Sequence, residues 1–310
     1  MSAVSKTVGA VRDFWRADDF PYFLITFKQY EHERGSGDGS QFTNAFWIYM
    51  SRLDSLSGYL PILAHEAFHE WNPGRMGIMS GSERERISWF WEGFTRYYGS
   101  LLVYRAGLMP LSEYLDSINF GLRKLPGSND PNDRGRLIAL WLDGRIRKDS
   151  NHQSSLDNVM FDMVHEADKP LTEARILDTA GRYLGPDSRV ELDQIVRSGA
   201  QITTLDDALG ACAHASMEEL LAFDLGFDFE ASTAAHNVIG VRRDGLALQA
   251  GLRDGQILTG WSVDRNEPDK AAKFTVQTNA GGKTKIEYYP KGKMITVPQY
   301  HLDSGACRTP

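Results

Sequence analysis

The residues best suited to chemistry in this chain are two histidines and two glutamates. His65 and His69 enclose Glu66 in the run His-Glu-Ala-Phe-His, and Glu92 follows downstream. On a helix, residues four apart share a face, so the two imidazoles can bind one metal ion. Glu66 would then lie beside that ion, where a base could take a proton from water that the metal activates. Two histidines and one carboxylate suit zinc and leave a fourth position for water and substrate, so the pattern predicts a zinc-dependent peptidase.

Two helices are expected to position these residues. The apolar flank from Tyr59 to Ala64 predicts a buried helix start, and Asn72-Pro73-Gly74 predicts the helix end. A second helical pattern runs from about Ile87 to Ala106 and contains Glu92 in its first half. The alternative is a surface helix with two unrelated histidines and a solvated glutamate. The aromatic surroundings of Glu92 argue against it, because carboxylates are seldom placed there without a partner.

The identity of the third ligand separates the zinc peptidase subclasses. A third histidine six residues beyond His69 would indicate the metzincin pattern, but Arg75 occupies that position. A glutamate from the following helix is the gluzincin arrangement, and Glu92 is the best-placed candidate. Glu83 and Glu85 lie in a polar segment that predicts a solvated loop or a helix entry.

Two motifs carry a resemblance to a known family. Residues 65–72 and 91–98 resemble the HExxHxWN and EGFTxYY motifs of the glycyl aminopeptidase family of gluzincins. Residues 134–143 resemble the next helix of that family, and the C-terminal part resembles the PDZ domain that these enzymes carry. The resemblance covers nearly the whole chain. It implies that His65, His69 and Glu92 are zinc ligands and that Glu66 is the general base.

The chain departs from the family pattern at two places. Family members usually carry a tyrosine before the later helix, and its hydroxyl stabilises the oxyanion of the tetrahedral intermediate. Here Asn132 stands at that position, and an amide is much shorter than a phenol. The loss of one oxyanion donor can cost on the order of a hundredfold in rate. A Gly-Leu-Glu-His type motif near the substrate amine is replaced by residues 37–44, so the glycine preference need not carry over.

The patterns predict an α+β fold of two domains. Residues 1–226 would form a thermolysin-like gluzincin catalytic domain, a small sheet plus a helical lobe, as the resemblance implies. Within it, Phe20–Lys28 and Asn44–Met50 are expected strands, and Gln29–Ser40 an expected loop. From Ser55 to about Leu221 the patterns are predominantly helical.

Residues 227–310 would form a small β-rich PDZ-like domain. Its expected strands are Val238–Val241, Ile257–Trp261, Phe274–Val276 and Lys285–Tyr289, with a short helix at Gly245–Leu252 that ends at a glycine. Residues 250–258 resemble the Ala-Gly-Leu-x-x-Gly-Asp-x-Ile stretch of PDZ domains. Such a domain can bind an extended peptide at its sheet edge, or it can serve only to pack against the catalytic domain.

Composition narrows the possible partners and location. The 310 residues have a net charge of −7 and no run of Lys or Arg, which argues against a nucleic-acid partner. No apolar stretch approaches a membrane span. Met1–Asp19 lacks a hydrophobic signal region, whereas the resemblance implies a periplasmic or secreted protein with a further β-rich domain ahead of the catalytic one. The two cysteines, Cys212 and Cys307, could form one disulfide if the protein is exported.

Two functions remain open at the level of sequence. The first is a zinc metallopeptidase of aminopeptidase type that hydrolyses a peptide or protein substrate. The second is a peptide-binding protein that retains zinc and has little or no turnover. The complete ligand set and Glu66 favour the enzyme, and Asn132 keeps the alternative open.

Overall fold

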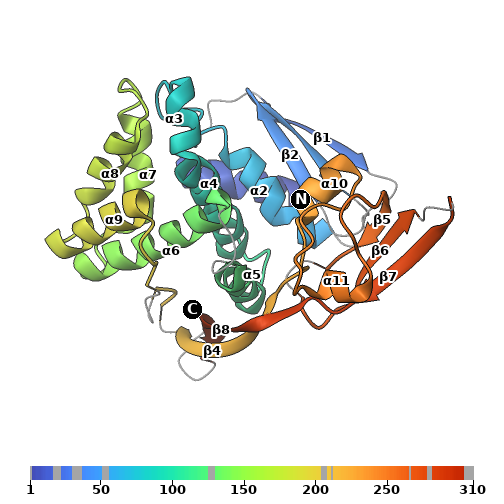
Figure 1. Ribbon diagram of the computed structural model, residues 1–310. Coiled ribbons are helices and arrows are strands. Elements are labelled where there is room, and N and C mark those ends of the chain that lie inside the picture. Colours follow the sequence, from blue (N-terminus) through green and yellow to red (C-terminus); the bar gives the residue numbers. More distant parts are fainter. Residues whose placement is uncertain are drawn as a thin grey trace. The chain divides into compact units, whose positions relative to one another are not determined.

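The computed structural model describes residues 2–16, 22–29, 37–50, 56–124, 130–203, 208–210, 212–264, 267–277 and 281–303 (Figure 1). The chain divides into two compact units. The first comprises Met1–Ser216 and Pro298–Pro310, and the second comprises Met217–Val297. The second unit therefore begins before the expected boundary at residue 226, and the last residues of the chain belong to the first unit.

A three-stranded sheet lies near the start of the first unit. It contains β1 (Leu24–Gln29), β2 (Gly37–Phe42) and β3 (Ala45–Met50) in the order β1-β3-β2. β1 pairs with β3 in parallel and β2 pairs with it antiparallel. Residues 37–40, expected in a loop, instead belong to β2. Their small and polar side chains have little strand propensity, so the ladder to β3 supplies the order that local sequence does not.

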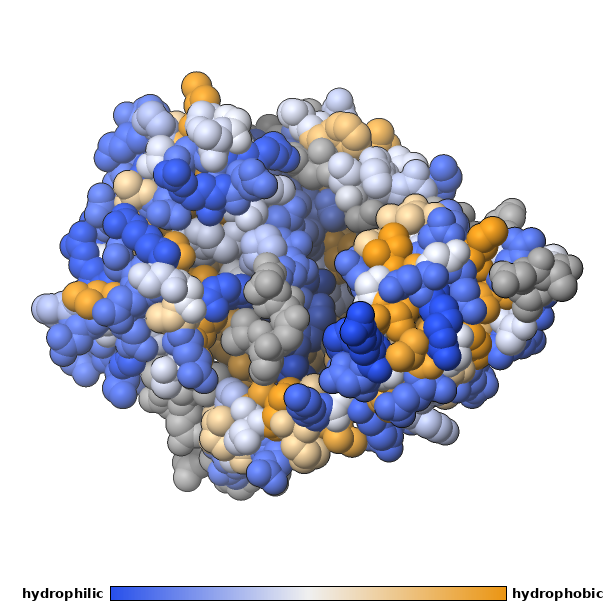
Figure 2. Space-filling model, viewed as in Figure 1, coloured by the Kyte–Doolittle hydropathy of each residue, from blue (hydrophilic) through white to orange (hydrophobic). Residues whose placement is uncertain are grey.

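Helices form most of the remaining described part of this unit. They are α1 (Ala3–Trp15), α2 (Leu60–Phe68), α3 (Gly81–Arg86), α4 (Ser88–Arg105), α5 (Leu111–Lys124), α6 (Pro131–Asp149), α7 (Leu156–His165), α8 (Glu173–Gly181) and α9 (Pro186–Ser198), with a 3-10 turn at Leu56–Tyr59. The two expected helices around the histidines and Glu92 are thus confirmed as α2 and α4. The visible face of α7, α8 and α9 is largely hydrophilic (Figure 2). Among the described residues, no helix combines the length and the hydropathy that a membrane span requires.

Close backbone contacts hold α2, α4 and α6 together. A Cβ added at Gly93 of α4 would lie 2.4 Å from the Cα of Gly135 on α6, and one added at Gly135 would lie 1.9 Å from the carbonyl oxygen of Trp89. A Cβ at Gly99 would lie 2.8 Å from the carbonyl oxygen of Pro61 on α2. Only glycine permits such an approach, so these three positions bring the helix backbones directly against one another.

The helical prediction fails from residue 213 onward. Ala213–Phe223 forms strand β4, which pairs with β8 (Lys291–Leu302). Met, Glu, Leu and Ala in this segment favour helix in isolation, but pairing with another strand overrides that weak preference. Cys212, directly before β4, is in a disulfide. Cys307, the other cysteine of the predicted pair, lies outside the described residues.

The second unit has a small sheet and a core of its own. β5 (Leu258–Ser262), β6 (Ala272–Gln277) and β7 (Lys283–Tyr288) form an antiparallel sheet, accompanied by α10 (Phe229–Ala235) and α11 (Leu246–Ala250). The predicted stop of the short helix is confirmed, since Gly251 caps α11 with φ +107°. The strand predicted at Val238–Val241 is wrong: only Asn237 makes a bridge, to Ile257. The PDZ-like assignment stays a prediction.

Candidate metal centre

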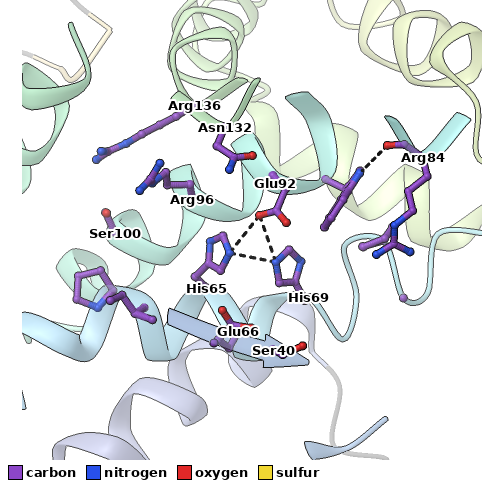
Figure 3. A pocket seen from close by; sticks show the side chains of 16 residues that line it. Ser40, His65, Glu66, His69, Arg84, Glu92, Arg96, Ser100, Asn132 and Arg136 are labelled. Carbon is purple, nitrogen blue, oxygen red and sulfur yellow. Dashed lines mark hydrogen bonds and ion pairs between the residues drawn. The ribbon is translucent and has the colours of Figure 1, made fainter. Parts of the chain in front are cut away.

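The structure brings His65, His69 and Glu92 together at one point. Their potential ligand atoms all lie within 4.8 Å of one another. The two Nε2 atoms are 3.0 Å apart, and Oε2 of Glu92 lies 3.4 Å from Nε2 of His65 and 3.7 Å from that of His69 (Figure 3). Three nitrogen and oxygen atoms so close together could hold one small cation.

The local fold around His69 explains this convergence. His69 directly follows the last residue of α2, and its backbone N–H donates to the carbonyl of His65, so the two side chains still share one helical face. The chain then turns within Trp71–Gly74. A Cβ at Gly74 would lie 2.3 Å from the carbonyl oxygen of Glu70, so this tight turn needs glycine.

Asn72 connects this turn to α4. Its backbone carbonyl accepts a hydrogen bond from Nδ1 of His69 at 2.9 Å, and its buried side chain donates to Oγ1 of Thr95 at 3.1 Å. A carbonyl can only accept, so Nδ1 of His69 carries a proton and Nε2 is the nitrogen that faces the cluster. This is the arrangement that orients metal-binding histidines in proteins.

The electrostatics of the cluster also fit a cation. Burial and the neighbouring His69 lower the pKa of His65 to about 4, so this imidazole is neutral at neutral pH. Burial alone would raise the pKa of Glu92, but hydrogen bonds from both histidines hold it well below its ordinary range. Burial would lower the pKa of His69, but the hydrogen bond and charge of Glu92 raise it, so a cation would have to displace a proton from this ring. Two imidazole nitrogens and one ionised carboxylate form a donor set that suits Zn²⁺.

Glu66 lies beside the three residues and outside their ring of atoms. It is buried with 6 % exposure and lines the same pocket, and its charge adds to the larger effect of Glu92, which raises the pKa of His69 against burial (Figure 3). A Cβ added at Gly39 of β2 would lie 2.4 Å from Cδ and Oε1 of Glu66. The Gly39 backbone therefore packs directly on the carboxylate and fixes one side of it.

Glu70, next to His69, holds the β2–β3 turn in place. Its Oε2 accepts a hydrogen bond from the backbone N–H of Asn44 at 3.1 Å, and Arg75 lies 3.7 Å from its Oε1. Asn44 adopts a left-handed conformation with φ +55° in the turn that connects the two strands. Glu70 thus anchors the strand that carries Gly39 to the helix that carries Glu66.

The cluster opens into a pocket of about 620 Å³. Besides the four predicted residues and Asn132, its polar lining includes five residues that sequence reasoning did not select: Ser40, Arg84, Arg96, Ser100 and Arg136. A periodic signal was present for some of them. Arg96 and Ser100 follow Glu92 at intervals of four on α4, and Arg136 follows Asn132 by four on α6, so each set shares a helical face.

Other candidates lie outside the site. Glu83 and Glu85 are on the exposed helix α3, and Glu83 instead pairs with Arg86 and accepts from the backbone of Glu173. The two tyrosines of the second motif are buried. Tyr97 donates to Asp143 and Tyr98 donates to Asp157, so both serve the core.

Comparison with known proteins agrees with the motifs. The family model of the M61 glycyl aminopeptidases matches residues 58–155, a stretch that contains both histidines, Glu66 and Glu92. The crystal structure of an aminopeptidase N family protein from Idiomarina loihiensis shares the fold, with a TM-score of 0.65 and 16% sequence identity over 96% of this chain. The chain spans 63% of the length of that structure. No curated protein matches it significantly. Residues 58–155 are thus similar to the M61 glycyl aminopeptidase family, the family that the two motifs resemble.

Proposed function

We propose that the protein is a zinc-dependent metallopeptidase of aminopeptidase type, with a thermolysin-like catalytic unit. The observation that carries this proposal is the convergence of His65, His69 and Glu92 with Glu66 directly beside them. His65, His69 and Glu92 would hold the zinc ion. When bound, zinc would supply Lewis-acid chemistry, polarising the scissile carbonyl and making water more acidic.

The chain's own groups would handle the protons. Glu66 would accept a proton from the attacking water and later deliver it to the leaving amine. The Gly39 backbone packed against it would hold the carboxylate in position for both transfers. Asn132, from the first turn of α6, would offer its amide to the oxyanion in place of the tyrosine hydroxyl of family members.

A second function is supported by the same Asn132. It lines the pocket with a side chain shorter than a phenol, and a missing oxyanion donor would leave a protein that binds zinc and peptides with little turnover. In that case the second unit would act as a PDZ-like peptide-binding domain, and recognition rather than hydrolysis would be the role of the molecule.

Metal content and cleavage separate these functions. The protein is loaded with zinc, its metal content is measured by plasma mass spectrometry, and a mixed peptide library is incubated with wild type and Glu66→Gln. We expect stoichiometric zinc in both and single residues removed from N-termini by wild type alone. Internal cuts that depend on Glu66 would retain the peptidase and reject the aminopeptidase. Stoichiometric zinc without any cleavage would favour the binding protein.

The ligand assignment has its own test in the same assay. His69→Ala and Glu92→Ala each remove one of three donors, so zinc occupancy should fall at equal free zinc concentration. Arg189→Gln, on an exposed part of α9, is the control and should keep full occupancy. Full occupancy in Glu92→Ala would remove this residue from the metal site.

A further inference from the structure

One end of the pocket carries an excess of positive charge. Arg96 and Arg136 lie on the same side of the metal cluster as Ser100, and Arg84 lies on the other side (Figure 3). The two guanidinium groups are close enough for the charge of Arg96 to lower the pKa of Arg136. Both positions face the pocket from different helices, α4 and α6.

A single carboxylate serves the cations in this region. Asp133 is buried and accepts from Nη1 of Arg96 at 3.0 Å and from Nζ of Lys124 at 2.6 Å. Arg136 donates only to neutral groups, the carbonyl and the hydroxyl of Ser117, each at 2.7 Å. Asp133 therefore pairs with Arg96 and Lys124, whereas the hydrogen bonds of Arg136 go to uncharged groups.

Arg136 is the residue for which this uneven pairing matters most. It is only 6 % exposed, and its Nε has no hydrogen-bond partner among the described residues. Burial lowers its pKa to about 10, so the group is still charged at neutral pH. The charge of Asp133 acts on Arg136, but this carboxylate is hydrogen-bonded to Arg96 and Lys124 instead. A buried cation is costly unless an anion balances it. The pocket end therefore suits a negatively charged ligand group.

The described lining of the pocket also offers no spare carboxylate that could bind the amine of a peptide. Among the described side chains that line it, only Glu66 and Glu92 are acidic, and both belong to the proposed catalytic centre. Three arginines line the same pocket. The distribution of charge favours a substrate that brings a carboxylate into the pocket.

We infer that Arg96 and Arg136, with the hydroxyl of Ser100, bind a carboxylate of the peptide substrate. This inference rests on the proposed peptidase function and specifies its substrate class. The carboxylate can come from an acidic side chain or from the C-terminus of a short peptide. Arginine is suited to either, because its planar fork matches a carboxylate with two parallel hydrogen bonds.

Binding measurements with an inactive protein test this inference apart from turnover. Zinc-loaded Glu66→Gln is titrated calorimetrically with alanine hexapeptide amides that carry one glutamate at successive positions, and with the matching glutamine peptides. All-alanine peptides with a free or an amidated C-terminus form the second arm. We expect one acidic form, side chain or C-terminus, to bind about tenfold to a hundredfold tighter than its neutral partner.

Substitutions assign that preference to the two arginines. Arg96→Gln in the Glu66→Gln background should reduce the preference to a few-fold, and Arg136→Lys should reduce it less than Arg136→Gln because a charge remains. Arg189→Gln matches the charge change at an exposed site and should leave the preference intact. Since Arg136 also connects α6 to Ser117, Arg96→Gln is the decisive variant if the Arg136 variants fail to fold.

The outcomes separate this inference from the proposed function. Equal affinity for acidic and neutral peptides in both arms would overturn the carboxylate site, as would a preference that survives Arg96→Gln. If wild type cleaves none of the peptides that bind, the peptidase is wrong, while a preference that depends on Arg96 still establishes the carboxylate site.

Discussion

At the scale of single residues, Asn72 has the widest influence on the metal centre. Its carbonyl fixes the ring of His69, and its side chain contacts Thr95 one turn of α4 beyond Trp91 and Glu92. The residue thus couples two elements that carry the proposed ligands. These two hydrogen bonds give a physical reason for an asparagine at this position of the first motif.

We therefore expect Asn72→Ala to weaken zinc binding. Loss of a group that orients a ligand costs about tenfold to a hundredfold in metal affinity. Competition with a chromophoric chelator measures this affinity. Asn119→Ala is the matched control. Asn119 is also buried, and its side chain is hydrogen-bonded to the backbone of Tyr300 rather than to a residue of the metal centre. Equal affinities of the two variants for zinc would contradict the role of Asn72.

Gly39 offers a way to disturb Glu66 without touching it. In Gly39→Ala the new methyl group would overlap the carboxylate, the movable end of a side chain, so Glu66 should shift while the backbone stays. We expect kcat to fall by at least tenfold with zinc retained, since a small misplacement of a catalytic group can cost about a hundredfold. Gly9→Ala, where a Cβ meets nothing within 4 Å, should leave kcat unchanged. Parallel kinetics and zinc analysis check both.

Asn132 tests the oxyanion side of the pocket. If the missing phenol limits turnover, Asn132→Tyr should raise kcat by on the order of tenfold or more, because one oxyanion donor is worth about a hundredfold. Asn132→Leu, which lacks any donor, should lower it. Steady-state rates on one peptide decide the matter, and a tyrosine variant slower than wild type would count against this position as the donor site.

At the scale of elements, the crossing of α4 and α6 depends on glycine. A methyl group at Gly135 would collide with the backbone of Trp89, so Gly135→Ala should destabilise the first unit by about 1–3 kcal/mol or more. Gly121 on α5 is the matched helical control, because its Cβ would meet only Cδ2 of Leu137 at 3.8 Å. Gly121→Ala should stabilise the first unit by up to about 1 kcal/mol. In urea unfolding, the midpoint should therefore fall for Gly135→Ala and rise for Gly121→Ala.

How much of the structure could be predicted from the sequence also differs from element to element. The convergence of the two histidines was predictable because a helix places His65 and His69 on one face whatever surrounds them. Arg96 and Arg136 were not selected, because their importance depends on which charges of a distant helix face them. β4 was mistaken for helix and Val238–Val241 for strand for the same reason, since strand pairing is a non-local property that local propensity does not contain.

At the scale of the molecule, the two units have separate hydrophobic cores. The three residues of the candidate metal centre, His65, His69 and Glu92, all belong to the first unit. At a free zinc concentration of 100 times the Kd, zinc binding adds about 2.7 kcal/mol to the unfolding free energy of the unit that binds it.

For a unit of this size, that corresponds to a rise in Tm of about 5–10 °C. Calorimetric scans with zinc and with a chelator should therefore move the transition of the first unit and leave that of the second in place. Glu92→Ala should abolish the shift. A zinc-dependent shift of both transitions, or of neither, would contradict the assignment of the metal centre to the first unit.

The glycine contact between α4 and α6 has a consequence for how this pocket could diversify. Glu92 adjoins Gly93, and the spacing of the two helices there is set by backbone against backbone rather than by interlocking side chains. The frame that carries Glu92 therefore depends on these glycines more than on what stands at positions 96 and 100, whereas Arg136 also joins α6 to Ser117 and Asn132 belongs to the proposed catalytic centre. Positions 96 and 100 are thus the sites at which mutation can install new selectivities while the reactive centre keeps its dimensions.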